Sequence, residues 1–115
     1  MMTHKIFQMP FAKIYSCYVT KLERKNKNSM DLDHIIVWLT GYSEQELVKV
    51  VNDEISLALF FEQAPQLNQN WQLITGKICG QSIETIQDPL MRKIRCLDKL
   101  VDELAKGKSL EKLLV

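Results

Sequence analysis

The clearest pattern of apolar and polar positions in this chain lies between Asp88 and Gly107. Its apolar residues recur every three or four positions: Leu90, Ile94, Leu97, Val101 and Leu104. This spacing places them on one face of a helix with about 3.6 residues per turn. Asp88 can accept hydrogen bonds from the first backbone N–H groups, Pro89 suits the first helical position, and Gly107 can close the last turn. The run therefore predicts one amphipathic helix whose apolar face is buried.

The same spacing predicts two helices in the first part of the chain. One covers about residues 10–26 and begins at Pro10. Its apolar positions are Phe11, Ile14, Tyr15, Tyr18, Val19 and Leu22. The next begins at a cap residue, Ser29 or Asp31, and ends at Gly41, where a left-handed backbone is easy for glycine. Its apolar face is formed by Leu32, Ile35, Ile36 and Leu39.

Capping signals predict the next two helices. Ser43 and Glu46 have the spacing of a capping box, in which each side chain accepts a hydrogen bond from a backbone N–H of the other residue. We therefore expect a helix over about residues 43–53, with its apolar positions facing inward: Leu47, Val50 and Val51. Ser56 begins a short helix through Phe60 and Phe61, which Pro65 stops.

The pattern between residues 66 and 86 is ambiguous. Asn70 could cap a helix that ends at Gly80, whereas the β-branched residues around Gly76 would also suit a short strand. We expect a helix or an irregular turn, because no partner strand with alternating polarity is evident. Ser109 is expected to cap a last short helix. The chain thus predicts an all-α fold, a small orthogonal bundle of five to seven helices in a single domain over residues 1–115, with one short irregular or β-like segment allowed near residues 71–80.

Composition places the chain among soluble proteins without adding chemistry. Hydrophobic residues make up 46% and charged residues 25% of the 115 positions. No apolar run approaches the roughly 20 residues that span a bilayer, and no secretion signal is recognisable at the N-terminus. The three cysteines are odd in number and far apart, which fits a reducing compartment and a buried, hydrophobic role for each. We expect a cytoplasmic protein without a membrane partner.

Charge is distributed unevenly although the net charge is only +1. Residues 1–28 carry six lysines and arginines against one glutamate, a net +5, whereas residues 29–66 carry one lysine against seven acidic residues, a net −6. The plainer interpretation is that these opposite charges attract each other within the monomer or are solvated, since such asymmetry is weak evidence for a functional patch.

Five segments together resemble a known family: MPFAKIYSCYVTKLERK, WLTGYSEQEL, FFEQAP, ITGKICG and DPLMRKIRCLDKLVDELAKGKSLEKLL. They are similar to a family of small bacterial proteins described as a domain of unknown function, the one numbered 2200. The resemblance covers nearly the whole chain and implies a bacterial, cytosolic, single-domain protein. It implies no activity, substrate or cofactor, and it assigns no catalytic residue. Cys96 stands where an aromatic such as Tyr is expected in similar proteins, which argues against a role for a thiol there.

One cluster of cations suggests a binding site. Arg92, Lys93 and Arg95 lie in the first turns of the Asp88 helix, where the positive end of the helix dipole disfavours them. Pairing with the acidic segment, residues 29–66, would explain this placement. The alternative is a ligand site in which Lys77, Arg92 and Arg95 hold a phosphate or carboxylate through forked hydrogen bonds.

Other classes of function find less support. The two helices joined at Gly41 have the outline of a helix-turn-helix, but the second is acidic, so nucleic acid is an improbable partner. His4 and His34 lack a Cys or His at zinc-ligand spacing, so no metal is expected. No nucleophile and base stand at recognisable spacing, so we predict no catalytic residue and no cofactor, and the enzyme interpretation ranks last.

The preferred hypothesis is a protein-interaction or assembly module, with weak nucleic-acid or anion binding as the alternative. The chain has many large aromatic residues for its size, and any that lie outside the core could anchor a protein partner. A homodimer is expected about as often as a monomer. Its contact surface would be the terminal apolar stripe, Leu110, Leu113 and Leu114, which needs cover.

Overall fold

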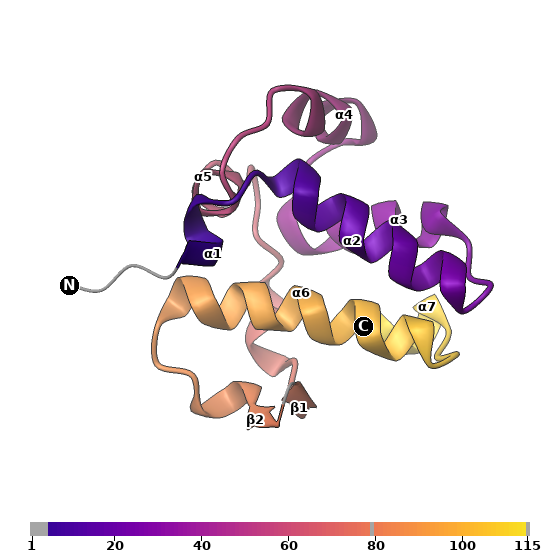
Figure 1. The fold of residues 1–115 in the computed structure, drawn as a ribbon. Helices are drawn as coiled ribbons and strands as arrows, with labels where there is room; N and C mark the ends of the chain where they lie inside the picture. Colours follow the sequence, from indigo (N-terminus) through magenta and orange to yellow (C-terminus); the bar gives the residue numbers. More distant parts are fainter. Residues whose placement is uncertain (1–4, 79, 115) are drawn as a thin grey trace.

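The computed structural model describes residues 5–78 and 80–114. Within these residues the chain forms seven α-helices, two short 3-10 helices and one two-stranded sheet (Figure 1). The α-helices are α1 (Lys5–Gln8), α2 (Phe11–Arg24), α3 (Ser29–Thr40), α4 (Glu44–Asn52), α5 (Leu57–Glu62), α6 (Pro89–Ala105) and α7 (Leu110–Leu113). The prediction of an all-α fold is confirmed, with α1 as an addition that the apolar pattern did not indicate.

Helix α6 is the long element against which the rest of the molecule packs. Asp88 caps it by accepting hydrogen bonds from the backbone N–H groups of Leu90 and Met91, and Pro89 occupies the first turn, as predicted. Figure 1 shows α2 running alongside α6, with α7 folded back against its C-terminal end. Its predicted apolar face is buried at four positions, Ile94, Leu97, Val101 and Leu104, while Leu90 is half-buried.

The turn between α3 and α4 is tightly specified. Gly41 ends α3 in a left-handed conformation, with φ at 80°. A Cβ atom on Gly41 would lie 2.7 Å from the backbone nitrogen of Gln66 and 2.8 Å from its carbonyl oxygen, closer than real contacts allow. Ser43 then begins α4 with both hydrogen bonds of the predicted capping box to Glu46. Glycine is therefore required twice at position 41, by its φ and by the adjacent chain.

Residues 69–85 contain the short β-like segment that the sequence left as an alternative, in place of the preferred helix that would end at Gly80. Asn68 caps a short 3-10 helix, η1 (Gln69–Leu73), after which β1 (Lys77–Ile78) pairs antiparallel with β2 (Gln81–Ser82). A second 3-10 helix, η2 (Ile83–Thr85), follows directly. The missing partner strand is thus the segment just after Gly80, whose φ of 80° suits the connecting loop. Two-residue strands are too short to show alternation, which is why the pattern did not reveal them.

One cluster of buried side chains draws on helices from both ends of the chain. At its centre the rings of Phe11 and Phe60 stack with their centroids 3.8 Å apart, and the Tyr42 hydroxyl donates to the carbonyl oxygen of Phe60 at 2.7 Å. The single core agrees with one domain, although the domain division stays a prediction. None of the helices in the described ranges is long and apolar enough to cross a bilayer.

Candidate functional site

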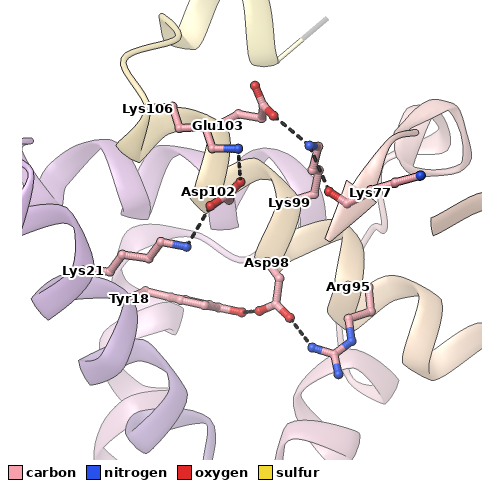
Figure 2. Close-up of polar contacts among 9 residues, drawn as sticks. All are labelled: Tyr18, Lys21, Lys77, Arg95, Asp98, Lys99, Asp102, Glu103 and Lys106. Atoms are coloured by element: carbon pink, nitrogen blue, oxygen red, sulfur yellow. Dashed lines mark hydrogen bonds and ion pairs between the residues drawn. The ribbon is translucent and has the colours of Figure 1, made fainter. Parts of the chain in front are cut away.

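The structure separates the three residues of the predicted anion site. Arg92 lies over the Trp71 ring, 5.3 Å from its centroid, and donates from Nη2 to the carbonyl oxygen of Gln72 at 3.1 Å. Arg95 donates from Nη1 to Asp98 at 2.9 Å. The Lys77 side chain is exposed and extends away from Arg95 (Figure 2). The three residues therefore serve separate contacts, and their role as one ligand site stays a prediction.

Within the described residues, these cations do not form the expected ion pairs with residues 29–66. Arg95 takes its partner from its own helix, and Lys93 lies over the Trp71 ring, 5.6 Å from its centroid. An aromatic face offers a cation its negative quadrupole, so Trp71 stabilises the charges that the helix dipole disfavours. Arg92 Nε is buried without a hydrogen-bond partner within the described residues.

The side of α6 that faces α2 and β1 carries two groups of ion pairs, which together we call the α6 polar network (Figure 2). Asp102 forms ion pairs with two lysines: its Oδ1 lies 3.1 Å from Nζ of Lys21 in α2, and its Oδ2 lies 3.0 Å from Nζ of Lys106. Lys99 pairs with Glu103 at 2.7 Å and also donates to the carbonyl oxygen of Lys77 at 3.1 Å. Burial alone would raise the pKa of Asp102, but hydrogen bonds and charges from Lys106 and Lys21 outweigh it and lower that pKa. The network therefore neutralises its carboxylates internally.

A separate polar cluster joins Tyr18 of α2 to Asp98 and Arg95 of α6. The Tyr18 side chain is buried, and its hydroxyl donates to Asp98, whose other carboxylate oxygen accepts from Arg95 (Figure 2). Burial first, and the charge of Asp98 second, raise the pKa of Tyr18 well above its usual value. The phenol thus stays neutral at any ordinary pH. This arrangement joins α2 to α6 through hydrogen bonds to both oxygens of Asp98.

A different surface lies where α2, α3 and α4 meet, and we call it the α2–α4 groove. Its volume is about 280 Å³. The residues that line it are Tyr15, Met30, Asp33, Glu44, Leu47, Val48, Val51 and Asn52. Val48 and Met30 are 60% and 62% exposed, and Leu73 is the one other large hydrophobic residue this exposed among the described residues. Two of the three exposed hydrophobic side chains therefore gather in this one groove.

The polar groups of the groove are acidic. The Tyr15 hydroxyl donates to Asp33 Oδ1 at 2.6 Å, and the second oxygen of Asp33 has no hydrogen bond within the described residues. Burial, followed by the hydrogen bond and charge of Asp33, raises the pKa of Tyr15, so the phenol stays protonated and acts as the donor. Glu44 stands at the exposed first turn of α4. The groove thus combines an apolar floor with two carboxylates.

The apolar pattern did contain a signal for this groove. Met30 and Val48 are apolar residues that fall outside the predicted buried faces of their helices. Since isolated exposed hydrophobic residues are common, each means little alone. What the sequence could not supply is that the packing of α3 against α4 brings the two side chains into one groove.

The remaining candidate residues are the cysteines and the possible metal ligands. In the part of the chain that is described, no three His, Cys, Asp or Glu side chains could together hold a metal ion. Cys96 is buried as predicted, and burial raises its pKa to about 11, although Arg92 opposes this. Cys17 is exposed, contrary to the prediction, because it lies on the solvent side of α2. His4 and Cys79 lie outside the described residues.

The predicted dimer surface is largely used within the monomer. Leu113 is 8% exposed and belongs to the core, while Leu110 and Leu114 are half-buried and pack against it. Helix α7 packs against the C-terminal end of α6, and this contact buries much of the surface of its leucines. The homodimer stays a prediction, but it is no longer needed to cover these three leucines.

Comparison with known proteins agrees with this architecture. A crystal structure described as that of the uncharacterized protein SP1917 is 42% identical and superposes with a TM-score of 0.92, over 98% of this chain and 93% of that chain. Among curated proteins, none matches the chain significantly. A family model described as "Uncharacterized protein conserved in bacteria (DUF2200)" matches residues 5–115. Neither description names an activity. The chain belongs to this bacterial family.

Proposed function

We propose that the protein is a protein-interaction or assembly module without catalytic activity of its own, and that the α2–α4 groove is its docking surface. The observation that carries this proposal is the gathering of Met30 and Val48, both more than half exposed, over the half-buried Val51 in one groove. Exposed apolar side chains that gather in this way, with polar residues at the rim, are typical of protein-binding surfaces.

The volume of the groove is compatible with a few side chains of a protein partner. Pockets for drug-sized molecules hold roughly 300–1,000 Å³ and enclose most of the ligand. At about 280 Å³ the α2–α4 groove lies at the lower limit of this range. A space of this size suits a few anchoring side chains of a protein, which commonly supply most of the binding energy of an interface.

Site-specific photo-cross-linking in the bacterial cell tests this proposal. The photoreactive residue p-benzoylphenylalanine replaces Val48 in one variant and Leu73 in the control variant, since Leu73 is 73% exposed but lies outside the groove. We expect discrete adducts from position 48 that are absent from position 73 and that disappear when Met30→Gln is added. Circular dichroism checks that each variant is folded. No adduct at position 48, or the same adducts at both positions, would contradict the proposal.

The cytoplasm is the proposed compartment. Its support is that Cys17 and Cys96 are free thiols, and Cys17 is exposed, a state that a reducing environment maintains. Cell fractionation followed by immunodetection tests this, and recovery from the periplasm would contradict it.

A further inference from the structure

We infer that the occupant of the α2–α4 groove is a basic amphipathic helix of a separate protein, which inserts apolar side chains between α3 and α4 and places lysines or arginines against Asp33 and Glu44. This inference rests on the proposed function, because it names the partner of the same groove. Three observations carry it: the charge of the groove, its shape, and the absence of a suitable counterpart in the chain's own described surface.

The charge of the groove is wholly negative. Of its eight lining residues two are carboxylates, Asp33 and Glu44, and none is Lys, Arg or His. The surrounding segment, residues 29–54, contains six acidic residues and one lysine, a net −5. Asp33 uses one oxygen for Tyr15 and leaves the other without a hydrogen bond within the described residues. A lysine or arginine of a partner could donate a hydrogen bond to this second oxygen. Partly desolvated charge pairs of this kind contribute to the specificity of an interface.

The shape of the groove suits one face of a helix. Its apolar floor consists of side chains from two helices, Met30 of α3 with Leu47, Val48 and Val51 of α4. Grooves between packed helices commonly accept an amphipathic helix, whose residues at i, i+3 or i+4, and i+7 serve as anchors. A volume of about 280 Å³ leaves room for only a few such anchors.

A second copy of this chain is the weaker candidate. The apolar faces of its own helices are used in the core, as in α2, where Phe11, Tyr18 and Leu22 are buried. Among the described residues, Met30, Val48 and Leu73 are the exposed large hydrophobic side chains, and two of these are the groove itself. A copy would therefore present at most Leu73 as an exposed large apolar anchor, and pairing of groove with groove would bring two acidic surfaces together at a cost. Its basic segment, residues 1–28, offers cations but no exposed large hydrophobic residue among the described positions.

The negative charge also distinguishes the proposed partner from other large ligands. Phosphate groups dominate the affinity of nucleic acids, and anionic headgroups dominate the attraction of membranes for basic surfaces. Both would be repelled by Asp33, Glu44 and the neighbouring Asp31 and Asp53. A cationic protein segment is the macromolecular occupant that the charge favours.

Two matched series of helical peptides test the inference with the full-length protein. Each peptide carries leucines at helical spacing, with lysines and arginines at the other positions in one series and glutamates in the other. Several leucine spacings are included. Two-dimensional NMR of the labelled protein follows the signals of Met30 and Val48, and fluorescence anisotropy gives the Kd. We expect the best basic peptide to bind in the groove at least about tenfold more tightly than its acidic counterpart, and to weaken as salt rises.

A charge variant and its control sharpen the result. Glu44→Gln should weaken the basic peptide about threefold or more, whereas Glu62→Gln, which removes an exposed carboxylate outside the groove, should leave its Kd unchanged. Equal binding of both series, or tighter binding of the acidic one, would overturn the basic-helix inference and leave the docking surface standing. The inference also falls if position 48 cross-links only to a second copy. If neither series shifts the groove signals and position 48 yields no adduct, the proposed function fails as well.

Discussion

Helix α2 makes two tyrosine–aspartate hydrogen bonds, and they lead to opposite conclusions about the two sides of the molecule. Tyr18 is buried and donates to Asp98, whose second oxygen accepts from Arg95. Tyr15 is half-buried and donates to Asp33, whose second oxygen has no hydrogen bond in the described part of the chain. The first pair is complete within the fold, whereas the second leaves a carboxylate available in a groove with exposed hydrophobic side chains.

This difference separates charges that build the fold from groups that remain for a partner. The cations at the start of α6 drew attention in the sequence because the helix dipole disfavours them. In the structure they lie over Trp71 or pair with Asp98, so the fold accounts for them. The groove side is acidic, but its carboxylates did not form a recognisable site in the sequence, and Met30 and Val48 remain exposed there.

The largest expected effect concerns the turn that holds the groove together. Gly41→Ala should lower the free energy of unfolding by about 3 kcal/mol, because the added Cβ meets the Gln66 backbone and a non-glycine residue is strained at this φ. Gly80→Ala is the matched control, since Gly80 has the same φ of 80° but nothing within 4 Å of the added Cβ. It should cost only about 1 kcal/mol. Urea denaturation measures both, and equal losses would show that the approach of Gln66 is unimportant.

The two tyrosines provide the next test of the comparison. Tyr18→Phe should cost about 2 kcal/mol, because it removes a buried hydrogen bond to a charged group. Tyr15→Phe should cost less than about 1 kcal/mol, since water can reach Asp33 in the groove and replace the lost donor. Urea denaturation of the two variants gives the difference directly. If Tyr15→Phe proved as costly as Tyr18→Phe, the groove would be part of the structural core and the contrast would fail.

Local signals predicted most helix boundaries, although the cap of α3 is Asn28 and not Ser29 or Asp31. The Asp88 cap, the Ser43 capping box and the glycine that ends α3 depend on neighbouring residues, and each is present as predicted. The sequence could offer the hairpin at residues 77–82 only as an alternative to a helix, because its strands are two residues long and no periodicity marks them. The contact of Gly41 with Gln66 joins distant parts of the chain and has no local signal at all.

The candidate site was harder to predict than the fold, for a related reason. Charge clusters can be found in a sequence, but whether a cation is paired depends on tertiary neighbours such as Trp71 for Arg92. The groove depends on how α3 and α4 pack, which brings Met30 and Val48 together across 18 positions of sequence. The sequence therefore pointed to clustered cations as the binding site, and exposed hydrophobic residues such as Met30 and Val48 could be recognised only from the packing of the helices.

The α6 polar network should show itself in the dependence of stability on pH. Because the pKa of Asp102 is lowered on folding, its contribution is full above its ordinary pKa of 3.8 and is lost as the pH falls through the lower folded value. Asp102→Asn should cost about 1 kcal/mol at pH 7 and nothing at strongly acid pH. Lys106 has the opposite sign: its raised pKa means that its contribution is kept below pH 10.5 and lost as the pH rises further.

Urea denaturation between pH 2 and pH 7 measures the effect of Asp102→Asn. The control is Glu62→Gln, which removes an exposed carboxylate that forms no ion pair among the described residues. A pH-independent difference for Asp102→Asn would mean that its ion pairs with Lys21 and Lys106 add no stability. The α6 side would then depend on Tyr18 and the apolar core alone.

The smallest effect on stability is expected in the groove. The double substitution Met30→Gln and Val48→Gln should change the free energy of unfolding by less than about 0.5 kcal/mol, because both side chains are mostly exposed and contribute little to the core. The same substitution should abolish adducts from a photoreactive residue placed at the neighbouring Asn52, which also lines the groove. Side chains that are exposed and that the fold does not need are most readily explained by a binding partner. A loss of several kcal/mol would instead identify Met30 and Val48 as structural residues and remove this argument.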